Sequence, residues 1–153
     1  MGSRVGRALP AYATSVGKAM LAYSPGLTIG FDLTLTLLSI LVAVVVTGCG
    51  WATALYGGSL VPRLAGGALA GLGVGAMHFT GMSAMMVGAR IGWSADLVVA
   101  SLVIGAIGMA VAAASVFSAN RVIGRYGSAG LMVLSIVALH FTAMGALTLT
   151  PDP

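Results

Sequence analysis

Charged side chains are nearly absent from this sequence. Only 7% of its 153 residues are charged and glutamate does not occur, whereas 59% are apolar and the mean hydropathy is +1.07. An ordinary soluble domain carries about 25% charged residues. The composition therefore excludes an ordinary soluble domain and predicts an integral membrane protein whose main partner is the lipid bilayer.

The same scarcity argues against several classes of function. The net charge of +4 comes from basic residues that stand singly between apolar runs, so we expect no binding of nucleic acid. Cys49 is the single cysteine and cannot form a disulfide within the chain. The sequence has no Cys-x-x-Cys pair, no paired carboxylates, no glycine-rich phosphate loop followed by lysine and no Ser-His-Asp set. We therefore do not expect an enzyme.

Four charge-free intervals are long enough to cross a bilayer, because a spanning helix needs about 20 mostly apolar residues. The links between them are short, so successive helices should be antiparallel neighbours. The predicted fold class is all-α, a polytopic membrane helical bundle with four clear transmembrane helices. These helices are Leu33 to Pro62, Leu64 to Ala89, Leu97 to Asn120 and Tyr126 to Pro151.

A two-helix repeat is visible when the sequence is shifted by 62 residues, which places His78 on His140, Met82 on Met144 and Arg63 on Arg125. The repeats cover about 32–93 and 94–153. Each contains an even number of spans, so the repeats are parallel and their histidines lie at one depth. Residues 1–31 are interpreted as a degenerate or truncated first repeat that ends in a remnant of the motif. The alternative is an unrelated polar leader.

Short basic links predict the orientation of the bundle. Arg63, Arg121 and Arg125 all fall on one side of the membrane, where no acidic residue accompanies them. Because Lys and Arg in short loops near helix ends favour the cytoplasm, we expect this side to be cytoplasmic.

The only two histidines, His78 and His140, are the first functional candidates. Each sits midway along an uncharged segment, where an imidazole is energetically expensive. Met82 and Met144 follow them by four residues, on the same helical face, and Met77 adjoins His78. Imidazole beside thioether sulfur favours copper, above all Cu(I). The residues alone leave a second interpretation open, in which the methionines fill gaps and the histidines donate hydrogen bonds to hydroxyls of neighbouring helices.

The phrases Met77-His78-Phe79-Thr80-Gly81-Met82 and Leu139-His140-Phe141-Thr142-Ala143-Met144 resemble the tandem motif of the MHYT family, with Phe in the place of Tyr. This family consists of bacterial integral membrane sensor domains, and the resemblance runs from about Ala19 to Ala146. It implies a seven-helix domain of the bacterial cytoplasmic (inner) membrane that binds copper and through it senses a diatomic gas (O2, CO or NO). The implied metal ligands are Met77, His78, Met82, His140 and Met144.

The sequence departs from the family pattern in its first motif, where Val16 stands at the position of the histidine. Leu139 also replaces the leading Met of the last motif. Family members often precede cytoplasmic signalling domains, which implies a cytoplasmic signalling partner for a chain without an output domain. We therefore expect a non-enzymatic membrane sensor. The alternatives are a b-type haem protein with His78 and His140 as axial ligands, and a small membrane transporter.

Overall fold

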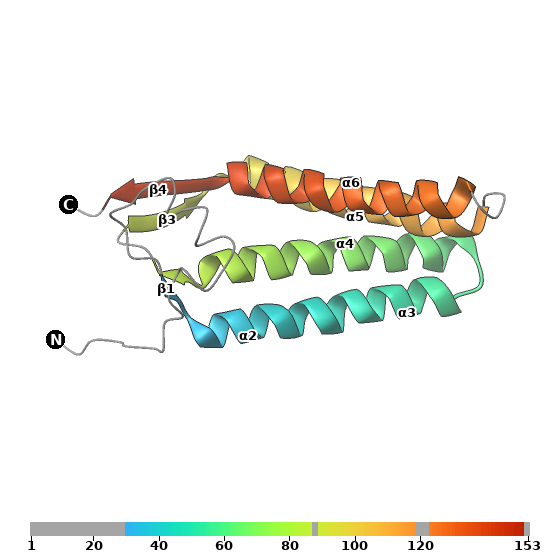
Figure 1. Cartoon of the computed structure of the whole chain (residues 1–153), viewed down its shortest axis with the longest axis horizontal. Helices are drawn as coiled ribbons and strands as arrows, with labels where there is room; N and C mark the ends of the chain where they lie inside the picture. The colour runs from blue at the N-terminus through green and yellow to red at the C-terminus, as the bar shows by residue number, and fades with distance from the viewer. Residues whose placement is uncertain (1–29, 87–88, 119–122, 152–153) are drawn as a thin grey trace.

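The computed structural model describes residues 30–86, 89–118 and 123–151. The proposed first repeat, residues 1–31, therefore lies almost entirely outside the described residues. The described chain forms four helical spans and two pairs of short strands, with the strands gathered at one end of the bundle (Figure 1).

Each of the four spans is long and apolar enough to cross a membrane, which confirms the predicted membrane helical bundle. The first span, Leu33–Tyr56, is one continuous rod that contains a π-helical segment, so three labels describe it. The elements are α2 (Leu33–Val42), η2 (Ala43–Thr47), α3 (Gly48–Tyr56), α4 (Leu60–Ser83), α5 (Ala95–Ser118) and α6 (Ile123–Gly145).

The helix boundaries follow local chemistry. The carboxylate of Asp32 accepts a hydrogen bond of 3.0 Å from the backbone N–H of Leu35 and so caps α2. Gly58 has φ of +69°, a left-handed conformation that glycine adopts without strain, and it turns the chain between α3 and α4. Pro62 lies in the first turn of α4, where no intrahelical partner exists for a backbone N–H. The helix break therefore precedes Pro62, earlier than the sequence predicted.

The predicted helices to Ala89 and to Pro151 were wrong at their ends, because α4 stops at Ser83 and α6 stops at Gly145. The segments beyond are strands. Counting apolar residues extends a helix through them, whereas Leu147 to Thr150 alternate apolar and hydroxyl side chains with the period of two that is typical of a strand. The antiparallel pairs are β1 (Gly30–Phe31) with β2 (Met85–Met86), and β3 (Ala89–Trp93) with β4 (Leu147–Pro151).

Each strand pair joins the segment just before the first helix of a repeat to the segment that follows its second helix. Phe31 pairs with Met85, and 62 residues later Trp93 pairs with Leu147. The hydrogen bonds beside them also recur: the N–H of Asp32 donates to the carbonyl of Ala84 over 2.7 Å, and that of Ser94 to Ala146 over 2.9 Å. The repeat seen in the sequence is thus a repeat of backbone geometry.

Helix α4 is central and packs against both the first span and α5 through glycines. On one side, a Cβ atom added at Gly66 would lie 2.4 Å from the carbonyl oxygen of Gly50. On the other side, a Cβ added at Gly71 would lie 2.2 Å from the carbonyl oxygen of Gly105. Neither side has room for a side chain, so the helices meet backbone to backbone, as small residues allow in membranes.

We expect Gly71→Ala to lower the melting temperature of the detergent-solubilised protein. Overpacking costs about 1–3 kcal/mol, and here the new methyl group meets backbone atoms that cannot rotate away. Gly130→Ala on α6 is the matched control, because nothing lies within 4 Å of a Cβ at that position. Thermal unfolding followed by circular dichroism measures both variants. Equal stability of the two would contradict the backbone contact between α4 and α5.

Candidate functional site

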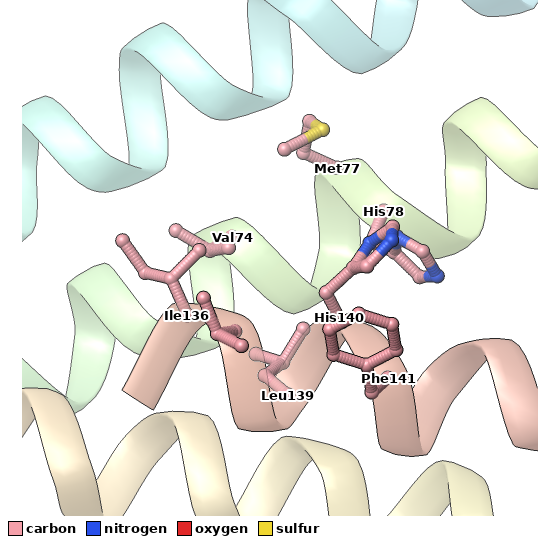
Figure 2. Close-up of a pocket in the computed structure, with 8 residues that line it drawn as sticks. Val74, Met77, His78, Ile136, Leu139, His140 and Phe141 are labelled. Carbon is pink, nitrogen blue, oxygen red and sulfur yellow. The ribbon is translucent and has the colours of Figure 1, made fainter. Parts of the chain in front are cut away.

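The two histidines meet between α4 and α6. The centroids of the His78 and His140 rings are 5.1 Å apart, and the ring planes form an angle of 85°. Figure 2 shows the two imidazoles side by side, one from each helix. Repeat symmetry places them at the same level, and the packing of the repeats brings them into direct contact.

A cavity of about 210 Å³ adjoins the histidine pair. Apart from the two imidazoles its walls are apolar, and only these two helices contribute to them. The cavity is large enough for a metal ion with a small ligand, and its polar groups are confined to one region. The lining residues are Val74, Met77 and His78 of α4, and Ile136, Val137, Leu139, His140 and Phe141 of α6.

The two histidines differ in their surroundings. His78 is 9% exposed and its Nε2 is buried without a hydrogen-bond partner, whereas His140 is exposed. A buried polar atom without a partner costs about 1–3 kcal/mol, and such an atom in a folded protein requires an explanation. A ligand bound between the rings would satisfy it.

Hydroxyl groups do not satisfy this nitrogen in the part of the chain that the structure describes. The buried serines on the neighbouring helices donate to carbonyls of their own helices, Ser39 to Thr36 and Ser101 to Val98, each over 2.7 Å. The interpretation of His78 as a residue that hydrogen-bonds across helices therefore has no support at Nε2.

The methionines fall into two groups. Met77 lines the cavity beside His78. Met82 and Met85 instead form a buried apolar cluster under the strands, one helical turn beyond the histidines, and Met144 packs against it. The remaining partly buried members of this cluster are Phe31, Ile91, Trp93 and Leu147.

The depth of the site differs from the sequence expectation. The uncharged interval around His78 runs to Ala89, which suggested a position midway along the segment. The helix ends at Ser83, however, only five residues beyond His78, or about 7.5 Å at the rise of an α-helix. The histidine pair lies near the end of the bundle that carries the strands.

The donor set is restricted to nitrogen and sulfur. Among the described residues there is no group of three or more His, Cys, Asp or Glu side chains that could hold a metal ion. A metal bound in the cavity would therefore rely on the two imidazoles and on thioether sulfur, which selects soft ions.

Comparison with known proteins identifies relatives that match most of the chain. The MHYT family model, described as a bacterial signalling protein N-terminal repeat, matches residues 18–67 and 71–129. An uncharacterised signalling protein of Caulobacter vibrioides is 42% identical over 135 residues, which cover 88% of this chain and 17% of that protein. No solved structure shows significant similarity.

Two relatives come from Pseudomonas aeruginosa. The bifunctional diguanylate cyclase/cyclic di-GMP phosphodiesterase MucR is 38% identical over 135 residues, covering 83% of this chain and 19% of MucR. The cyclic di-GMP phosphodiesterase NbdA is 36% identical over 140 residues, covering 86% of this chain and 18% of NbdA. The chain thus spans less than a fifth of the length of each of these relatives.

We expect His78→Leu to leave the melting temperature of the metal-free protein unchanged or to raise it. The substitution removes a buried polar atom without a partner and inserts an apolar side chain, so it relieves about 1–3 kcal/mol of desolvation cost. A structural histidine would instead weaken the fold when replaced. Leu139→Ala is the positive control, because this side chain is 1% exposed. Its replacement should lower the free energy of unfolding by about 2–5 kcal/mol.

Proposed function

The chain belongs to the MHYT family of bacterial signalling proteins, and we propose that it is a non-enzymatic sensor of the bacterial inner membrane. Its ligand site is the cavity between α4 and α6. The observation that carries this proposal is the buried Nε2 of His78, which lacks a partner although a second imidazole is in ring contact with it.

The residues that line the cavity fit copper. His78 and His140 supply two imidazoles and Met77 supplies a thioether, a set that favours Cu(I) over ions that prefer oxygen. Met77 takes precedence over Met82 and Met144 as the sulfur ligand, because those two pack in the apolar cluster under the strands. Copper held there would offer a coordination position to a diatomic gas such as O2, CO or NO.

The chain itself provides the means to respond. One imidazole lies on α4 and the other on α6, so any change in their separation moves one helix relative to the other. Near the histidines, each strand pair joins the segment before the first helix of a repeat to the segment after its second helix. A movement of α4 relative to α6 is therefore larger at the opposite end of these helices. That end carries Arg63 and is the predicted cytoplasmic side. A signalling domain or partner there would receive it, by analogy with MucR and NbdA.

The structure does not favour the two alternatives. In a haem protein with two axial histidines the macrocycle lies between the imidazoles, but here the rings are in direct contact. A cavity of about 210 Å³ is also smaller than the roughly 300–1,000 Å³ of sites for larger organic ligands. A transport path needs polar groups along its length, and this cavity has them only at the imidazoles.

Copper content tests the metal part of the proposal. We expect the wild-type protein, reconstituted with Cu(I) in detergent without oxygen, to retain about one copper per chain by elemental analysis. His78→Ala and His140→Ala should each weaken binding at least about 100-fold in competition with a chromogenic Cu(I) chelator, since the loss of second-shell partners alone costs about 10–100-fold.

Methionine variants locate the sulfur ligand and serve as matched controls. Met77→Leu should weaken Cu(I) binding, whereas Met82→Leu, Met144→Leu and Met109→Leu should not, because these side chains lie away from the cavity. Equal copper content in the wild type and in a variant that carries both His78→Ala and His140→Ala would contradict the proposed copper site. A Soret absorption band in the purified protein would favour haem.

A further inference from the structure

The two repeats contact each other inside the chain through one face of α4 and one face of α5. Gly67, Gly71 and Gly75 of α4 meet α5, and they are called here the leading face. A Cβ added at each would lie 2.5 Å from Met109 O, 2.2 Å from Gly105 O and 2.4 Å from Leu102 Cδ2 respectively, and the first two would also lie within 3.0 Å of the Cα atoms of Ala110 and Ala106. The face of α5 formed by Leu102, Ala106 and Ala110 is called here the trailing face.

The same two faces occur once more in the chain, and there no other described residue covers them. Adding 62 to the leading face gives Ala129, Val133 and Val137 of α6, all of which are exposed. Subtracting 62 from the trailing face gives Ile40, Val44 and Gly48 of the first span, and these are exposed as well. Nothing lies within 4 Å of a Cβ added at Gly48.

Exposure of these faces leaves a functional side chain uncovered. His78, beside the covered leading face, is 9% exposed, whereas His140, beside the uncovered one, is exposed. An imidazole that faces lipid is unfavourable, so burial of this face is favoured. The first span is also poorly buried: 11% of its most apolar 18-residue window is buried, against 33% in α4 and in α5.

We propose that two copies of this chain pair through these faces, with α6 of each copy packed on the first span of the other. The internal contact between α4 and α5 is the template, because α6 and the first span are the repeat counterparts of α4 and α5 and keep the same membrane orientation. Two copies related by a twofold axis along the membrane normal make this contact twice, which closes the assembly.

The template specifies the contacts between the copies. Val133 lies against Val44 of the second copy, Val137 against Ile40, and Ala129 against Gly48. Valines stand where the internal contact has glycines, so the helices of the dimer are farther apart than α4 and α5, and the dimer contact is weaker than the internal one. Because Val137 lines the histidine cavity, the second copy covers its open side and buries His140.

Cysteine cross-linking between differently tagged copies tests the pairing. Both copies carry Cys49→Ala, one carries Val44→Cys and the other Val133→Cys. The two are expressed together and oxidised in native membranes with an oxidant that contains no copper. We expect a disulfide-linked heterodimer. The matched control pairs Val45→Cys with Leu134→Cys, which are 52% and 65% exposed but whose repeat counterparts, Ile107 and Leu72, lie outside the internal contact. The control should cross-link severalfold less.

A second measurement does not depend on cysteine. The wild-type protein should be dimeric by native mass spectrometry from nanodiscs, and Val133→Trp should shift it to monomer while Leu134→Trp does not. A monomeric wild type, or equal cross-linking of both cysteine pairs, overturns the proposal. Efficient cross-linking of Ala19→Cys with Val133→Cys within one chain also overturns it, because residues 1–29 would then cover α6. None of these readouts requires metal, so the dimer and the copper site are tested separately.

Discussion

The absence of side chains along two faces of α4 is the constraint on which the rest of the structure depends. Gly66 meets the backbone of Gly50 on one face, and Gly71 meets the backbone of Gly105 on another. In lipid, association of helices gains little from hydrophobicity and relies on close packing. The contacts therefore fix the position of α4 along its own axis relative to both neighbouring helices. His78, carried by α4, is positioned by backbone atoms that have no rotamers to change.

The repeat explains how much of the fold could be read from the sequence. Four spans follow from apolar length, and the shift of 62 residues follows from matched motifs such as His78 and His140. Strand β2 could not be read in the same way, because Met85 and Met86 continue the apolar signal of α4 beyond Ser83. A strand of two residues has too short a pattern to show its period, and its partner is Phe31, more than fifty residues earlier.

The sequence predicted that the two histidines lie at one depth, but it did not predict which methionine lines the cavity beside them. Residues four apart share a helical face, which correctly aligns His78 with Met82 along α4, but a shared face does not imply shared surroundings. One turn beyond His78 the strands cover the helix, and Met82 packs under them with Met85. Met77 lines the cavity although it is adjacent to His78 in sequence, because the cavity lies in the groove towards α6. That groove is a tertiary feature without a local signal.

The difference between the two histidines has the same origin as their similarity. The two repeats present equivalent faces, and inside a chain with two described repeats the leading face of one is covered by the trailing face of the next. The leading face of α6 and the trailing face of the first span then have no neighbour within the described chain. Symmetry therefore produces one buried imidazole and one exposed imidazole from the same motif. Val137, His140 and Phe141 of α6 line the cavity, so a neighbour that covers this face of α6 would also cover the cavity.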